Sequence, residues 1–332
     1  MGRKRILWID YVKGLCMMTI ILNHIPGLPV SARLTYPYEL ICFFFVGGYT
    51  LTLKGNFRSY LSSKIQRLLF PIIAFGLINL TFAFLYKDAD PIERLKGIFL
   101  QLPGQYDEMW FVACLFIMEI IIYPLLAYIK SGWICMTIAL SGVVLAIDYL
   151  VPARIIIPWH ITNALLFLPV ILCGYLARSR GWIEMYRDKI KTERKLLLLP
   201  IAVYSASVLT LDNWPIDIHL LEYGNFPAFV LSSVAGLWMI VSISMKMEQF
   251  SSCRLADTVG FIGRNSLTYY GLQSKAISTM SIMLPYIGIT GPQGLSKLTI
   301  WIASLTVLAG ISYIVNHWLP FLTGNFADRK RT

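Results

Sequence analysis

Apolar stretches of about 20 residues, separated by short polar joints, dominate this sequence. An α-helix rises about 1.5 Å per residue, so about 20 residues cross the roughly 30 Å hydrocarbon core of a bilayer. Of the 332 residues, 57% are hydrophobic and 14% are charged, which leaves too little charge to cover the surface of a soluble domain. We therefore predict an all-α polytopic membrane protein in which residues 1–332 form a single transmembrane domain.

The lengths of the apolar stretches, the Pro and Gly positions and the charged breaks predict about ten transmembrane helices. The sequence shows no internal repeat, whereas inverted repeats are common in transporters. Nine helices are the alternative, because one segment (196–211) is short and another (265–284) contains Gln273 and Lys275. The predicted helices cover residues 6–27, 37–53, 66–86, 109–129, 133–151, 158–178, 196–211, 225–245, 265–284 and 297–319.

The distribution of Lys and Arg predicts the orientation of the bundle, because cytoplasmic loops retain these residues. With the N-terminus in the cytoplasm, 21 of the 29 Lys and Arg residues fall on the cytoplasmic side and 6 on the other side. Both termini are then cytoplasmic, and the segment 212–224, which has no Lys or Arg, faces outside. The Lys and Arg residues of the cytoplasmic loops thus account for the net charge of +11, and we expect no nucleic-acid partner.

The six cysteines show no paired spacing and no partner histidine, so we expect neither disulfides nor a metal site. The basic N-terminus resembles the start of a signal peptide. However, Lys13 interrupts the apolar run that follows, and no small-residue cleavage site is present. We expect a retained first helix.

The first predicted helix carries more polar side chains than the other apolar segments: Asp10, Lys13, Asn23 and His24. Ionisable groups inside a membrane are costly, so each is a functional candidate, although pairing offers a structural alternative. Asp10 and Lys13, three residues apart, can form such a pair. Lys13 and His24 are 11 residues apart, which places them within about 20° of one helix face and about 16 Å apart along the axis. One stripe of this helix thus carries a cation near the cytoplasm and an imidazole towards the outside.

Other polar residues occur singly in the predicted helices, and we expect them to form hydrogen bonds between helices. They include Glu119, Asp148, His160, Lys275 and His317. The basic segment 178–195 is predicted to be a solvated loop attracted to anionic lipid headgroups.

Several motifs occur in an order that resembles the acyltransferase family 3 membrane proteins. Arg5 precedes Ile-Asp-Tyr-Val-Lys-Gly, and Lys13 and His24 form a Lys-x10-His arrangement. Further similar landmarks are the aromatic run Phe43–Tyr49, the Lys64-x-x-Arg67 pair before Pro71, the Trp110-Phe111 dipeptide and the Gly263–Leu267 turn. The resemblance covers residues 5 to about 275, and sugar O-acetylases of the fucose 4-O-acetylase type look most similar. Members often have His where this chain has Glu39 and Gln273.

The resemblance implies an O-acyltransferase of a bacterial cytoplasmic (inner) membrane. Such an enzyme moves an acyl group, most often acetyl, from cytoplasmic acetyl-CoA to a hydroxyl of a glycan or lipid-linked sugar. His24 is then the general base, because a neutral imidazole, with an ordinary pKa of about 6.5, can take the proton of the attacking hydroxyl. Lys13, Lys64 and Arg67 would bind the phosphates of CoA. Glu39 would orient His24 and fix its tautomer.

Each of these roles has an alternative. Lys64 can be an ordinary anchor at the membrane surface, and Glu39 a solvated carboxylate at a helix end. His24 can carry the acetyl group covalently instead of acting as a base. Trp110, Asn265 and Ser266 can line the site, or can serve as an interface aromatic and a helix cap. A transporter or flippase of a polar lipid-linked sugar would use the same intramembrane residues, and a sensor subunit would leave them inactive.

Overall fold

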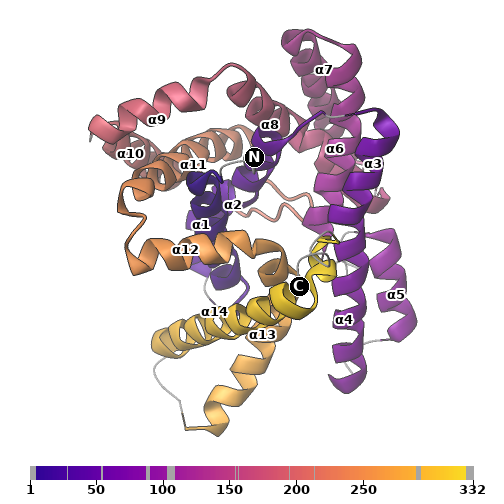
Figure 1. Cartoon of the computed structure of the whole chain (residues 1–332), viewed down its shortest axis with the longest axis vertical. Helices are drawn as coiled ribbons and strands as arrows, with labels where there is room; N and C mark the ends of the chain where they lie inside the picture. The colour runs from indigo at the N-terminus through magenta and orange to yellow at the C-terminus, as the bar shows by residue number, and fades with distance from the viewer. Residues whose placement is uncertain are drawn as a thin grey trace.

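The structure of the protein is a computed structural model whose described residues form helices and contain no strand (Figure 1). The described residues are 5–27, 29–53, 55–86, 90–102, 109–153, 155, 157–193, 195–212, 214–288 and 293–326. The helices are α1 (Leu7–Asn23), α2 (Pro29–Thr50), α3 (Phe57–Lys64), α4 (Phe70–Tyr86), α5 (Pro91–Leu100), α6 (Trp110–Tyr128), α7 (Gly132–Leu145), α8 (Ile161–Ser179), α9 (Trp182–Thr192), α10 (Lys195–Thr210), α11 (Phe226–Met247), α12 (Arg254–Arg264), α13 (Ser266–Tyr286) and α14 (Gln293–Trp318). Short π- and 3-10 segments complete them: Ile65–Leu69, Ala146–Leu150, Pro158–His160, Glu248–Phe250 and Pro320–Thr323.

Each predicted transmembrane range coincides with a helix, but two boundaries differ substantially. Helix α2 begins at Pro29 instead of residue 37, because Pro29 supplies the proline that suits a first turn, and Pro37 lies within the helix. The predicted range 66–86 is the second part of a longer helical run that starts at Phe57. Helices α5, α9 and α12 were not predicted, and α9 replaces the loop expected within residues 178–195.

Six segments of the described chain are long and apolar enough to cross a membrane. They are Phe57–Phe82, Trp110–Tyr128, Gly132–Leu150, Pro158–Ser179, Phe226–Phe250 and Gly294–Trp318. Four of the ten predicted helices, α1, α2, α10 and α13, are not among the six: α1 and α10 have only 17 and 16 residues, and α13 contains Gln273 and Lys275. The structure is therefore that of a helical membrane protein, and the count of about ten transmembrane helices stays a prediction.

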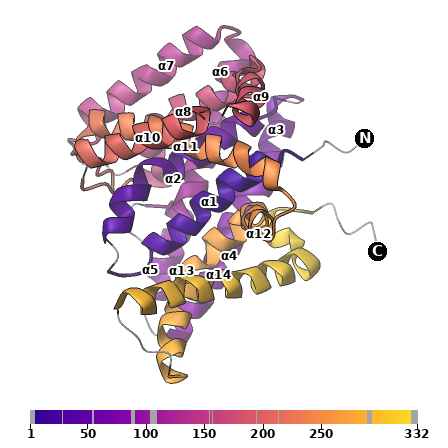
Figure 2. The ribbon, with the colours of Figure 1, turned by 90° about the vertical axis from the view of Figure 1, so that its left-hand side faces the viewer.

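Helix α1 lies at the centre of the bundle, where it packs against α2, α11, α12, α13 and α14 (Figures 1 and 2). Helix α2 packs against both α1 and α8. Gly48 and Gly174 allow this contact, because a Cβ at Gly48 would collide with the carbonyl oxygen of Ile171, and one at Gly174 with that of Phe45. Small residues of this kind let helix backbones approach closely in a membrane.

The N-terminal end of α1 and the C-terminal end of α14 lie on the same side of the molecule (Figure 2). That both ends of the chain lie on one side of the membrane stays a prediction. Which side is cytoplasmic stays a prediction from the charge distribution.

Candidate active site

Two neighbouring cavities lie among the helices. We call the first, of about 310 Å³, the basic cavity; Lys13, Lys64, Arg67, Glu119, Thr50 and Ser266 supply its polar lining. We call the second, of about 160 Å³, the acidic cavity; His24, Glu39, Tyr36, Trp110, Asp217 and His219 line it. Three residues, Ile20, Leu40 and Tyr270, line both cavities and define the junction between them.

One stripe of helix α1 runs along both cavities. Lys13 and Met17 line the basic cavity, Ile20 lies at the junction and His24 lines the acidic cavity. The intervals of four, three and four residues keep these side chains on one face of the helix. The prediction that Lys13 and His24 share a face of the helix is thus in agreement with the structure.

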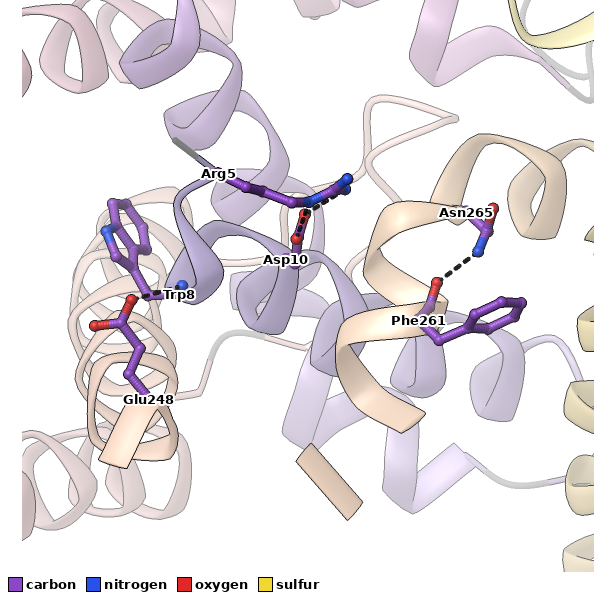
Figure 3. Close-up of polar contacts among 6 residues, drawn as sticks. All are labelled: Arg5, Trp8, Asp10, Glu248, Phe261 and Asn265. Carbon is purple, nitrogen blue, oxygen red and sulfur yellow. Dashed lines mark hydrogen bonds and ion pairs between the residues drawn. The ribbon is translucent and has the colours of Figure 1, made fainter. Parts of the chain in front are cut away.

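Asp10 does not form the predicted pair with Lys13. Its carboxylate instead accepts hydrogen bonds from Arg5, with distances of 2.5 Å from Nε to Oδ2 and 3.1 Å from Nη2 to Oδ1 (Figure 3). Arg5 precedes the helix, so its side chain can fold back onto the first turn in a geometry that helical spacing does not describe. Lys13 is left to face the basic cavity.

Further contacts hold the ends of the helices that build the site (Figure 3). The backbone N–H of Trp8 donates to Glu248 Oε1 over 3.2 Å, so a carboxylate lies at the N-terminus of α1. Asn265, at the joint between α12 and α13, donates to the carbonyl of Phe261 over 2.8 Å and accepts from Asn316 over 2.6 Å. Asn265 therefore acts as a helix-joining residue, and its neighbour Ser266 lines the basic cavity.

The cations of the basic cavity come from two helical regions. Lys64 ends α3, and its Nζ lies 2.5 Å from Glu119 Oε2 on α6. Arg67 lies in the π-helical segment Ile65–Leu69, a kind of distortion that is frequent at functional sites because it re-aims side chains. With Lys13, the lining carries three cations and one carboxylate, so the basic cavity favours an anion.

His24 is the C-cap residue of α1. Its Nδ1 lies 2.8 Å from the carbonyl oxygen of Ile20. A carbonyl can only accept, so Nδ1 carries the hydrogen and the neutral ring presents the lone pair of Nε2. The contact that we expected from Glu39 is therefore made by the backbone. Glu39 is buried and accepts from Asn23 Nδ2 over 2.7 Å.

The structure adds site residues that the sequence did not point out. Asp217 and His219 come from the segment between α10 and α11, and Tyr36 and Tyr270 come from α2 and α13. Trp110 was a weak candidate, and its ring centroid lies 5.2 Å from those of both His160 and His219. The one available signal was the acidic, Lys- and Arg-free composition of residues 212–224. Gln273 is buried in α13, outside the lining of both cavities.

The fold is that of an integral membrane protein, with one cavity lined by three cations beside a second cavity lined by His24. The described residues contain no cluster of His, Cys, Asp or Glu that could hold a metal ion. The family model of acyltransferase family 3, described as an acyltransferase domain, matches residues 6–317. The chain belongs to this family and is a membrane acyltransferase. Comparisons with curated proteins and with solved structures gave no match.

Proposed function

We propose that the protein is an acetyl-CoA-dependent O-acetyltransferase of a bacterial cytoplasmic membrane. It would transfer the acetyl group to a hydroxyl of a cell-surface glycan or lipid-linked sugar. The observation that carries the proposal is the position of His24 in a cavity that adjoins a second, cationic cavity through Ile20, Leu40 and Tyr270.

The basic cavity is the proposed donor site. Lys13, Lys64 and Arg67 supply the charge-assisted hydrogen bonds that the phosphates of CoA require. The thin pantetheine arm would then follow the stripe of α1 from Lys13 past Met17 and place the thioester at the junction. The phosphates would stay on the side of the N-terminus, which the charge distribution predicts to be cytoplasmic.

In the proposed reaction, Nε2 of His24 removes the proton of the acceptor hydroxyl while its oxygen attacks the thioester carbon. The resulting oxyanion collapses, the C–S bond breaks, and the thiolate of CoA takes the proton from the imidazolium. The products are the acetyl ester and free CoA, and His24 returns to its neutral form. Transfer through an acetyl-His24 intermediate is the alternative mechanism, and ping-pong kinetics would identify it.

Two further side chains have proposed roles. Tyr270 lines both cavities, and its hydroxyl accepts from the Phe111 N–H over 3.3 Å. The phenol can donate in turn, so we assign Tyr270 to stabilising the oxyanion. Glu39 would bind the acceptor instead of orienting His24, because His24 already has the carbonyl of Ile20 as its partner.

The test uses purified protein in lipid nanodiscs with acetyl-CoA, and the release of free CoA thiol is measured with and without glycan acceptors. We expect release that is lost in His24→Ala and retained in His317→Ala. His317 is a matched control, because its exposed ring stacks on Tyr313 at 4.8 Å and lies outside both cavities. Thioester cleavage that is absent from the wild type with every acceptor would favour a transporter, and cleavage that persists in His24→Ala would reject His24 as the general base.

A further inference from the structure

We propose that the acidic cavity selects an uncharged or cationic sugar as acceptor and rejects an anionic one, with Asp217 as the residue that sets this selectivity. The inference rests on the proposed function, because it concerns the acceptor of that same reaction. Its starting point is the contrast between the two joined cavities. The basic cavity carries three cations, whereas the described lining of the acidic cavity carries two carboxylates, Glu39 and Asp217, and neither Lys nor Arg.

The segment that supplies Asp217 is folded firmly into the bundle. The backbones of Asp217 and Glu222 exchange two hydrogen bonds, of 2.7 and 2.8 Å, and form an isolated bridge. Ile216 and Ile218 are buried, which fixes the segment against the core. Asp217, Ile218 and His219 of this segment line the cavity. Asp217 is thus held in place by its backbone, independently of any ligand.

The carboxylate of Asp217 can serve both the loop and a ligand. Its Oδ1 accepts from the backbone N–H of Leu220 over 3.1 Å, and no hydrogen bond to Oδ2 is found within the described part of the chain. A carboxylate oxygen can accept from a sugar hydroxyl or an ammonium group, and such charged hydrogen bonds are stronger than neutral ones. Glu39, on the α2 wall of the same cavity, adds a second carboxyl group, which is buried and accepts from Asn23.

The charge of the cavity sets the class of acceptor. The carboxylate of Asp217 in a partly buried space repels a phosphate, a sulfate or a uronic acid, because charges interact strongly where water is scarce. Trp110 adds an aromatic surface on which the apolar side of a pyranose ring can pack. The combination fits a hydroxyl-rich ring that is neutral or carries an amino group.

The opposite charges of the two cavities also keep the substrates apart. The CoA phosphates are attracted to Lys13, Lys64 and Arg67 and repelled from the acidic cavity. An acceptor without negative charge is not attracted by the cations of the donor site. The histidine therefore meets a donor from one side and an acceptor from the other.

The experiment compares three methyl glycosides that share one ring and differ in charge: the glucoside, the glucosaminide and the glucuronide. Radiolabelled acetyl-CoA and wild-type protein in nanodiscs give kcat/KM for each, together with the effect of each glycoside on His24-dependent hydrolysis of acetyl-CoA. We expect the glucuronide to be at least tenfold poorer than the glucoside, and the glucosaminide to equal or exceed the glucoside. Asp217→Asn should reduce the preference for the glucosaminide over the glucuronide at least fivefold.

Asp217→Asn retains an oxygen that can accept from Leu220, so the loop should keep its shape. Asp212→Asn is the matched control, because Asp212 belongs to the same segment but is exposed and outside the cavity lining. Should Asp217→Asn fail to fold, Asp217→Ser tests the same charge with a smaller side chain whose hydroxyl oxygen can still accept from Leu220, and should shift the preference in the same direction.

The proposal is overturned if the glucuronide is the best acceptor, or if Asp217→Asn and Asp212→Asn leave the preference equally unchanged. It is also overturned if none of the three glycosides is acetylated or alters the hydrolysis rate. These failures differ from failure of the proposed function, in which His24-dependent cleavage of acetyl-CoA is itself missing.

Discussion

Replacing Glu119 with Gln tests whether the cations of the basic cavity are held ready for donor phosphates. Lys64 Nζ lies 2.5 Å from Glu119 Oε2, and the side chains are 18% and 6% exposed. Removing one partner of a fully buried ion pair costs about 3–5 kcal/mol, because a charge is left without compensation. Lys64 faces a cavity that admits water, so we expect a loss of about 2–3 kcal/mol. This corresponds to a fall in melting temperature of roughly 5–10 °C.

Acetyl-CoA should reverse this loss. In Glu119→Gln the uncompensated Lys64 is available to a phosphate, which replaces the carboxylate as its partner. With saturating acetyl-CoA we expect the melting temperature to return to within about 2 °C of the ligand-bound wild type. The KM for acetyl-CoA should fall about two- to tenfold, because phosphate no longer competes with Glu119. Thermal unfolding in nanodiscs and steady-state kinetics measure the two effects.

Glu93→Gln is the matched control for this experiment. Glu93 pairs with Lys96 at 2.8 Å, but the side chains are 49% and 56% exposed, and such surface pairs contribute about 0–1 kcal/mol. We expect no change in KM and a shift of at most about 2 °C. An equal deficit in Glu119→Gln with and without acetyl-CoA, or a raised KM, would refute the assignment of the basic cavity to the donor.

Three further predictions concern the donor site, the junction and the packing. Lys13→Met should raise the KM for acetyl-CoA about 10- to 100-fold with little change in kcat. Acetylpantetheine, which lacks phosphates, should react equally with the wild type and with Lys13→Met. An equal loss of activity with both donors would contradict the role of Lys13 in binding phosphate. Tyr270→Phe should lower kcat about 10- to 1000-fold without changing the affinity for acetyl-CoA, which calorimetry measures. An unchanged kcat would show that Tyr270 does not stabilise the oxyanion. Gly174→Val should destabilise the fold by about 4 kcal/mol or more, because its side chain meets the backbone of α2. Size-exclusion chromatography of the detergent-solubilised protein measures the loss of folded protein. Gly310→Val in α14 is the control, because Gly310 is exposed, has open space around it and does not have a left-handed backbone.

The features that depended on local periodicity were predicted well from the sequence. The shared face of Lys13 and His24 follows from the fixed rotation of an α-helix, so the structure could place both residues along one route. The apolar helices follow from length and hydropathy for the same reason. The family was also evident, because its motifs are local and occur in order.

The features that depended on tertiary contacts were missed. Arg5 pairs with Asp10 by folding back from outside the helix, and Asp217 reaches the site because its segment inserts into the bundle. Helices α9 and α12 are polar on one side, so a search for apolar stretches treats them as loops. Helix α1, which carries the stripe along both cavities, does not meet the criterion for membrane spans because it has only 17 residues, and α13 does not because polar residues lower its hydropathy.

The junction of Ile20, Leu40 and Tyr270 has a consequence for the membrane as a whole. A protein with a water-accessible cavity towards each face endangers the ion gradients across the bilayer. Two aliphatic side chains at the narrow point disfavour a continuous water column, since apolar constrictions dewet. A flexible, uncharged thioester can pass such a point, whereas a hydrated ion would lose its water there. In the proposed reaction, the residues between the donor and acceptor sites would thus also limit the passage of ions through the bundle.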